Sequence, residues 1–253
     1  TGEVIGVEAL CRWTHPTLGS IPPDEFIEVA ERTHLIGPLT ELVLSDSLDA
    51  QVRWLAEGLN FPVAVNLSPL VLLDPTLSDR LEHELAVRGL PASALTLELT
   101  ETRVMGDDMR SIEALGRLDQ LGIRLSIDDF GTGYSSLAYL KGLPVSELKI
   151  DRSFVAEAMV DGHSGTIVAS TIDLARGLGL SVVAEGVEDR TTWEWLDQLG
   201  CNHMQGFYLS RPQPEEEFLR WVRQYQALRS AEAQVSRTPA QPQPSAPRTR
   251  ETT

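Results

Sequence analysis

The sequence predicts an α/β fold: a variant of the (β/α)8 TIM barrel, with a parallel sheet surrounded by helices. Short apolar runs alternate with amphipathic stretches along most of the 253 residues, which is the pattern of repeated strand–helix units. A chain of this length is often one barrel domain. Each apolar run also ends in or beside a polar residue, as expected at the rim of a parallel barrel, where active sites lie.

Seven apolar runs are expected to form the strands. They are residues 4–8, 61–66, 94–98, 123–128, 146–150, 181–185 and 201–205. Seven strands are one short of a closed (β/α)8 barrel, and the chain begins almost directly in the first run. We therefore expect a barrel that apparently lacks its first strand in this chain.

Helical spacing of apolar residues fills the intervals between these runs. Leu77, Leu81 and Leu85 fall on one helix face. Residues 22–32 and 214–225 each begin with proline and acidic residues, which are typical of helix starts. These patterns predict helices outside the sheet.

The end of the chain has a different composition. From Arg229 the sequence is rich in Pro, Gln, Ser and Thr and has no apolar periodicity. We expect a folded domain over residues 1–228 and a disordered Pro/Gln-rich tail over 229–253.

Charge and cysteine content exclude several classes of partner and location. The chain has 37 acidic and 21 basic residues, a net charge of −16, which disfavours binding to DNA or RNA polymers. No apolar run approaches the ~18 residues of a membrane span. The only cysteines, Cys11 and Cys201, do not form a disulfide framework and fit a reducing cytoplasm. We expect a cytoplasmic domain, although a missing upstream region could anchor the full-length protein to a membrane.

The polar residues at the strand ends suggest a metal site. They are Glu8, Asn66, Glu98, Asp128, Asp129, Lys149, Glu185 and Gln205. Carboxylate and amide oxygens are ligands that Mg²⁺ and Mn²⁺ prefer. Five carboxylates at one rim would raise one another's pKa, and two divalent ions would relieve that repulsion. Two such ions can bind the attacking and leaving oxygens of a phosphodiester.

Basic residues near these acids suit an anionic substrate. Lys149 could stabilise charge that develops on a phosphoryl group, and Arg12 could bind a phosphate oxygen. Cys11 is interpreted as a packing residue and Trp13 as a core residue rather than a base-stacking platform. The segment "DDFGTGYSSL", residues 128–137, is interpreted as a glycine-hinged loop that moves over the pocket.

Seven ordered motifs carry a resemblance to one family. They are "EALCRW", "VNLS", "LELTET", "DDFGTGYSSL", "LKIDRSF", "VVAEGVE" and "MQGFYLSRP". Over residues 1 to about 225 the chain closely resembles the EAL domain family, whose members are variants of the (β/α)8 barrel. The resemblance implies hydrolysis of cyclic di-GMP to linear pGpG in bacterial signalling, with two Mg²⁺ or Mn²⁺ ions.

The resemblance also implies a role for each site residue. It implies metal ligation by Glu8, Asn66, Glu98, Asp128, Asp129 and Glu185, with Asp128 bridging the two ions. The implied catalytic group is Glu8, Lys149, Glu185 and Glu101, in which Lys149 positions the attacking water and Glu101 anchors the loop over residues 128–137. The implied substrate contacts are Leu10, Arg12, Glu188 and Gln205.

The missing first strand and the family resemblance lead to further expectations. The chain resembles a fragment of a longer protein with an upstream sensor or GGDEF-type domain, and it could form a homodimer. Two alternatives remain open. One is a non-catalytic cyclic di-GMP receptor, and the other is a barrel lyase or isomerase with Mg²⁺ and a lysine base.

Overall fold

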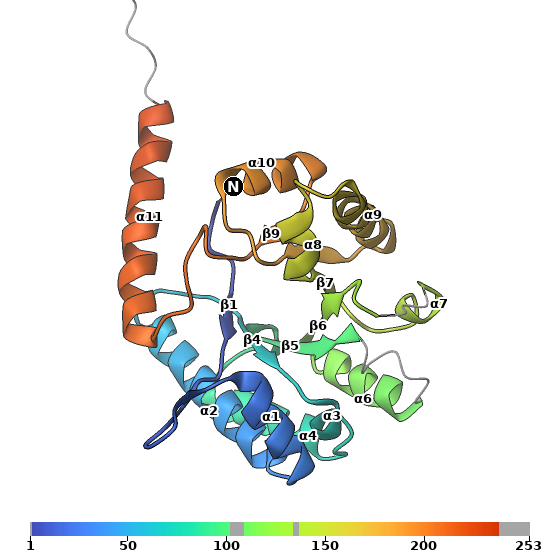
Figure 1. Ribbon diagram of the computed structural model, residues 1–253. Helices are drawn as coiled ribbons and strands as arrows, with labels where there is room; N and C mark the ends of the chain where they lie inside the picture. The colour runs from blue at the N-terminus through green and yellow to red at the C-terminus, as the bar shows by residue number, and fades with distance from the viewer. Residues whose placement is uncertain (1, 102–108, 134–136, 238–253) are drawn as a thin grey trace, which may run out of the picture. The chain divides into compact units, whose positions relative to one another are not determined.

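A computed structural model of the chain describes residues 2–101, 109–133 and 137–237 (Figure 1). Its contacts divide the chain into two units, of which one is Val4–Pro212 and the other joins the first residues to those from Gln213 onward. The Val4–Pro212 unit contains the sheet and every residue that the sequence predicted for the site.

A parallel seven-stranded sheet forms the centre of the Val4–Pro212 unit. Its strands are, in spatial order, β1 (Val7–Ala9), β4 (Val63–Asn66), β5 (Leu95–Thr100), β6 (Arg124–Phe130), β7 (Glu147–Ile150), β8 (Ser181–Ala184) and β9 (His203–Met204). These are the seven runs predicted from the sequence. Spatial order follows chain order, which is the arrangement of a (β/α) barrel. Within the described residues, β1 and β9 are the edges of this sheet.

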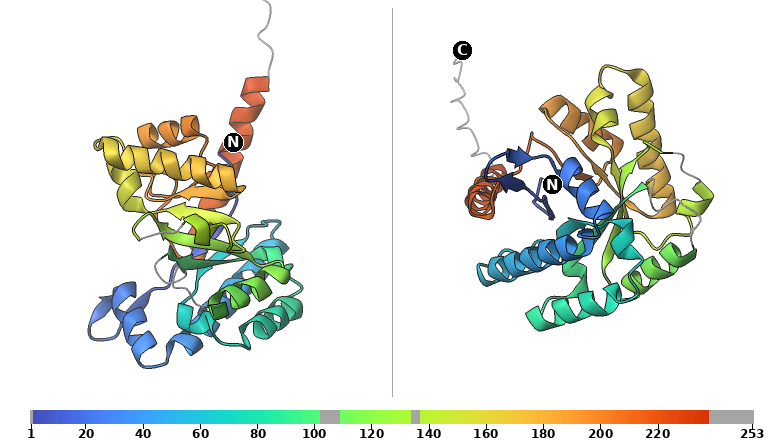
Figure 2. Two further views of the ribbon diagram at one scale, coloured as in Figure 1. Left: turned by 90° about the vertical axis from the view of Figure 1, so that its right-hand side faces the viewer. Right: turned by 60° about the horizontal axis from the view of Figure 1, so that its bottom comes forward.

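Helices cover the outside of the sheet, as Figure 2 shows from two directions. The helices of this unit are α1 (Pro23–Arg32), α2 (Ile36–Ala56), α3 (Pro69–Leu72), α4 (Leu77–Arg88), α6 (Met109–Gln120), α7 (Leu137–Leu140), α8 (Arg152–Glu157), α9 (Gly162–Leu178) and α10 (Arg190–Leu199), with a short 3₁₀ turn η1 (Ala92–Ala94). Leu77, Leu81 and Leu85 are all buried on α4, as their spacing predicted.

Burial on both faces explains the apolar character of the central strands. Leu95, Leu97 and Leu99 of β5 face one side of the sheet and are each 0% exposed. Glu98 on the other face is also buried, at 3% exposed. A strand between a barrel interior and a helix layer has no solvent face, so a run of apolar residues is favoured.

A β-hairpin follows β1 and was not predicted from the sequence. Strands β2 (Trp13–His15) and β3 (Gly19–Ile21) pair antiparallel. Trp13 is 45% exposed, with edge contacts to His15 and Phe26. The prediction that Trp13 is a core residue was therefore wrong, because a two-stranded hairpin leaves its outer face in solvent.

The second unit contains α11 (Glu215–Arg237). The hydroxyl of Tyr225 donates a hydrogen bond of 2.8 Å to the carbonyl of Gly2, and the Tyr225 ring stacks on Trp221. The helix extends nine residues past the domain boundary predicted at 228, since residues 229–237 contain the good helix formers Ala, Glu, Gln and Arg and Pro239 comes only later. Residues 238–253 of the predicted tail lie outside the described part.

Candidate active site

Lys149 lies at the centre of the acidic strand ends. Its side chain, on β7, is only 2% exposed. Its ammonium nitrogen contacts four carboxylates. The distances are 2.7 Å to Glu185 Oε1, 2.9 Å to Glu98 Oε1, 3.4 Å to Asp128 Oδ1 and 3.5 Å to Glu8 Oε2. Strands β1, β5, β6 and β8 therefore direct their acids to one point, as the strand-end pattern predicted.

The charge state of Lys149 follows from these neighbours. Burial alone would lower the pKa of its ammonium group, but attraction from Glu98, Glu8 and Glu185 outweighs burial, so the pKa is raised. Lys149 is therefore a fixed cation at neutral pH. It can donate hydrogen bonds and stabilise negative charge.

Glu8 connects the two edges of the sheet. Its Oε1 accepts a hydrogen bond of 2.8 Å from Asn66 Nδ2, and its Oε2 accepts one of 2.6 Å from Gln205 Nε2. Burial would raise the pKa of Glu8, but Lys149 and these two amide donors lower it below the usual value. Glu8 is thus held ionised. Its three partners compensate the cost of placing a carboxylate at the end of a buried strand.

Glu98 is the most deeply buried of the acids around Lys149, at 3% exposed. Lys149 contacts its Oε1, whereas its Oε2 is buried and has no hydrogen-bond partner among the described residues. Burial, with repulsion from Glu8 and Asp128, raises the pKa of Glu98 well above its usual value despite Lys149. A buried acid with an unpartnered oxygen is suited to a cation ligand.

Asp128 and Asp129 end β6 with an irregularity that brings both acids to the rim. Consecutive strand residues normally point to opposite faces, but the β6–β7 register shifts between Ile127 and Phe130, and Asp129 has a left-handed φ of 55°. Oxygens of Asp128, Asp129 and Glu185 consequently lie within 4.8 Å of one another. A bulge of this kind is not visible as a sequence pattern.

The electrostatics of this acidic trio also suit a cation. Burial and repulsion from Asp128 raise the pKa of Asp129 to about 6. Burial and Asp128 also raise the pKa of Glu185 to about 7, against the opposing effect of Lys149. Asp151, which sequence reasoning did not include, adds repulsion and a hydrogen bond to Asp129. Asp151 lies in the motif "LKIDRSF", one residue before α8, which is a typical position for a helix-capping aspartate. Its carboxylate accepts a hydrogen bond from the amide of Ser153.

Glu101 contacts the start of the segment predicted to be a loop. Its side chain is fully buried, and its Oε2 accepts a hydrogen bond of 2.7 Å from the backbone amide of Gly131. A β-carbon added to Gly133 would lie 2.9 Å from Glu101 Oε1, so a larger residue there would have to displace the Glu101 carboxylate. Residues 134–136 of the segment lie outside the described residues.

The remaining predicted residues are less closely connected to the acids. Leu10 is 40% exposed, and Arg12 and Glu188 are also exposed. Arg12 donates a hydrogen bond of 2.8 Å to the carbonyl of its neighbour Cys11. The structure therefore leaves these three side chains at the surface, open to a ligand, and does not join them to the acidic cluster.

The two cysteines do not enter the cluster either. Cys11 is half-buried. Cys201 is buried, and burial raises the pKa of its thiol to about 11, which makes it inert at neutral pH.

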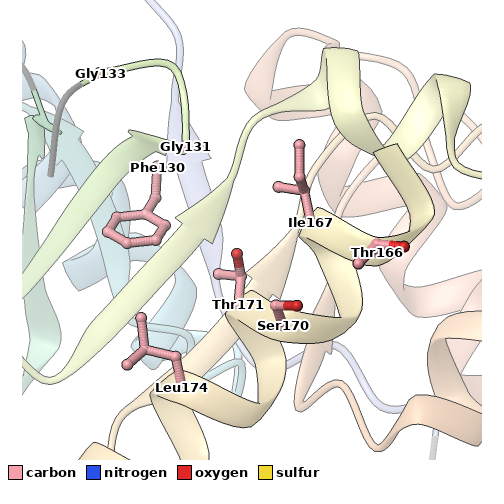
Figure 3. A pocket seen from close by; sticks show the side chains of 8 residues that line it. All are labelled: Phe130, Gly131, Gly133, Thr166, Ile167, Ser170, Thr171 and Leu174. Carbon is pink, nitrogen blue, oxygen red and sulfur yellow. The ribbon is translucent and has the colours of Figure 1, made fainter. Parts of the chain in front are cut away.

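A cavity of about 360 Å³ lies between the end of β6 and α9 (Figure 3). Its lining residues are Phe130, Gly131, Gly133, Thr166, Ile167, Ser170, Thr171 and Leu174. None of these is charged. The cavity therefore lies in the layer between sheet and helix and is distinct from the acidic strand ends.

The donor set around Lys149 fits a hard divalent cation. It combines the clustered oxygens of Asp128, Asp129 and Glu185 with the unpartnered oxygen of Glu98 and the amide of Asn66. The clustered donors include no histidine or cysteine, and oxygen ligands alone favour ions such as Mg²⁺ or Mn²⁺ over zinc.

Fold and site together define a (β/α)-barrel protein whose strand ends carry an acidic cluster suited to divalent cations. The chain belongs to the EAL domain family, which its sequence matches over residues 1–212. Within the described residues, no helix is both long and apolar enough to cross a membrane.

Two curated relatives show how the chain compares with whole proteins. It is 47% identical over 219 residues to the bifunctional diguanylate cyclase/cyclic di-GMP phosphodiesterase MucR of Pseudomonas aeruginosa, covering 86% of this chain and 32% of MucR. It is 37% identical over 224 residues to the cyclic di-GMP phosphodiesterase PdeR of Escherichia coli, covering 88% of this chain and 34% of PdeR. The chain thus spans about a third of the length of these relatives.

A solved structure shares the fold. The PaMucR phosphodiesterase in complex with c-di-GMP is 46% identical to this chain, with a TM-score of 0.82. The match covers 86% of this chain and 88% of that one. The EAL-type barrel predicted from the sequence is thereby confirmed.

Proposed function

We propose that this domain hydrolyses cyclic di-GMP to linear pGpG. The observation that carries the proposal is the convergence of Lys149 with Glu8, Glu98, Asp128 and Glu185, in a chain 47% identical to a cyclic di-GMP phosphodiesterase.

We propose two divalent ions, Mg²⁺ or Mn²⁺, as cofactors. Bound there, two ions would stabilise the charges on the attacking and leaving oxygens of the phosphodiester. The proposed ligands are Glu8, Asn66, Glu98, Asp128, Asp129 and Glu185. The unpartnered Glu98 oxygen and the Asp128–Asp129–Glu185 trio support this set.

The proposed role of Lys149 follows from its charge. Its raised pKa keeps it protonated, so it would orient the attacking water as a hydrogen-bond donor and stabilise charge that develops on the phosphoryl oxygens. The lyase or isomerase alternative requires a lysine base and a carboxylated substrate, whereas the 47% identity to MucR favours phosphodiester chemistry.

The surrounding residues would bind and orient the substrate. Leu10, Arg12 and Glu188 are exposed and free to contact the dinucleotide, and Gln205 would hold Glu8 in place through its 2.6 Å hydrogen bond. Glu101 would fix the backbone that follows Asp128 and Asp129, through its bond to Gly131.

The cellular setting is part of the same proposal. A longer protein with a sensor or GGDEF-type domain is supported by the greater length of the relatives and by the bifunctional name of MucR. A cytoplasmic location, supported by the two lone cysteines, and a homodimeric arrangement complete the proposal.

The test is turnover of cyclic di-GMP by the purified chain with Mg²⁺ or Mn²⁺, followed by chromatography of pGpG. We expect turnover by the wild type and a loss of at least about 100-fold in Glu8→Ala and Lys149→Ala. Glu41→Ala is the matched control, because Glu41 also pairs with a cation, Arg80, but lies on α2 among the outer helices. Tight binding of cyclic di-GMP without any pGpG would instead establish the receptor alternative.

A further inference from the structure

A hydrogen bond joins α1 to the residues that follow Asn66 at the end of β4. The hydroxyl of Ser68 donates to Glu31 Oε1 at 2.7 Å, across 37 residues of chain. Glu31 lies in the last turn of α1, and Ser68 is the second residue after Asn66. Neither residue was singled out by the sequence patterns, although Ser68 ends the motif "VNLS".

The backbone around Ser68 is fixed on the β4 side. The amide of Leu67 donates a hydrogen bond of 2.8 Å to the carbonyl of Glu98, which extends the β4–β5 pairing past Asn66. Ser68 then caps α3, because its Oγ accepts from the amide of Leu70 at 3.3 Å. Its hydroxyl thus accepts from α3 and donates to α1 at the same time.

Asn66 itself has little packing to hold it. The residue is exposed, and its side chain donates to Glu8 Oε1 at 2.8 Å. Its orientation is set by this bond, by the pairing of β4 with β5 at Glu98 and by the backbone that continues into Leu67 and Ser68. The α1 side is anchored by Phe26 and Ala30, which are 8% and 7% exposed.

The same bond closes a ring of the chain. Glu8 and Asn66 are joined directly by their side chains, and the segment that follows Glu8 runs through Leu10, Arg12 and the hairpin into α1, where Glu31 returns to Ser68. The chain from Glu8 to Glu31 is thus tied at both ends to the end of β4, at Asn66 and at Ser68.

We propose that Glu31 and Ser68 are positioning residues: together they form a clasp that orients Asn66 as a metal ligand. The inference rests on the proposed metal site. Outer partners of metal ligands typically change metal affinity by about 10–100-fold when removed.

The test measures Mn²⁺ affinity by calorimetry, without substrate, in the whole chain. We expect Ser68→Ala and Glu31→Ala each to weaken Mn²⁺ binding by about tenfold, and the double variant to be no weaker than the weaker single. Ser68→Thr keeps the hydroxyl and Glu31→Gln keeps an acceptor oxygen, so both should stay within about threefold of the wild type. Glu41→Ala, which breaks a 2.7 Å bond from Arg80, should leave the affinity unchanged.

Each other outcome has a definite meaning. Wild-type affinity in Ser68→Ala or Glu31→Ala, fully additive losses, or a loss in Glu31→Gln equal to that in Glu31→Ala overturns the clasp, the last because charge alone would then explain it. A fall in the unfolding midpoint with unchanged Mn²⁺ affinity also overturns it, since the bond would be merely structural. If the wild type binds no Mn²⁺, the proposed metal site fails and the clasp with it, whereas a failure of the clasp alone leaves wild-type binding and turnover intact.

Discussion

Gln205 donates a hydrogen bond of 2.6 Å to Glu8 across the gap between the two edge strands of the sheet. Glu8 belongs to β1, and Gln205 directly follows β9. The two ends of the sheet therefore meet through a side-chain contact at the site, and the same contact lowers the pKa of Glu8.

Gln205→Ala should destabilise the protein and weaken catalysis together. A hydrogen bond to a charged group contributes about 1.5–3 kcal/mol, so the free energy of unfolding in urea should fall by about that amount. The exposed Gln120→Ala on α6 is the control and should change it by less than about 0.5 kcal/mol. Equal stabilities of the two variants would show that the Gln205–Glu8 bond contributes nothing.

Lys149→Met should leave four carboxylates without their shared cation. Removing one partner of a buried charge cluster typically costs about 3–5 kcal/mol, so the metal-free variant should unfold at much lower urea concentration than the wild type. Mg²⁺ should restore more stability to the variant than to the wild type, because the ion replaces the lost charge. Equal Mg²⁺ stabilisation of both proteins would contradict the shared site.

The metal-free protein should lose stability as the pH rises from 5 to 7.5. Burial and neighbouring acids raise the pKa of Asp129 to about 6 and that of Glu185 to about 7, so the folded state holds these protons more tightly than the unfolded state. Their stabilisation is present below the unfolded pKa and is lost as the pH rises through the folded values. The pKa of Glu8 is lowered, so its contribution to stability changes only at lower pH, where its carboxylate takes up a proton.

Thermal unfolding in a chelator measures this effect. The midpoint should fall between pH 5 and 7.5 and should recover on addition of Mg²⁺ at pH 7.5. Asp129→Asn should make the dependence on pH shallower. A midpoint that rises over this range would contradict the assigned pKa directions.

Two glycine variants should change stability in opposite directions. A β-carbon at Gly206 would lie 2.2 Å from the carbonyl oxygen of Val187, so Gly206→Ala must displace the backbone beside Gln205 and should cost about 3 kcal/mol or more. Gly177→Ala on α9 meets nothing within 4 Å and should stabilise the protein by about 0.5–1 kcal/mol. Denaturant unfolding of both variants checks this pair, and a tolerated Gly206→Ala would refute the close contact.

Sequence reasoning predicted what periodicity and strand ends encode. The seven parallel strands and the convergence of Glu8, Glu98, Asp128 and Glu185 on Lys149 follow from apolar runs that end in charged residues. The bulge at Asp129 and the hydrogen bond between Asp129 and Asp151 could not be predicted, because they depend on local backbone geometry. The hairpin over residues 13–21 was missed because its strands have three residues each, too few to show alternation.

The most direct test of the central claim is hydrolysis of cyclic di-GMP in ¹⁸O-labelled water with Mg²⁺ or Mn²⁺. Attack of water on phosphorus predicts linear pGpG with one ¹⁸O atom in its terminal phosphate, formed by the wild type and not by Lys149→Met. Cyclic di-GMP recovered intact from wild-type protein that binds it, with either metal, would contradict the phosphodiesterase assignment.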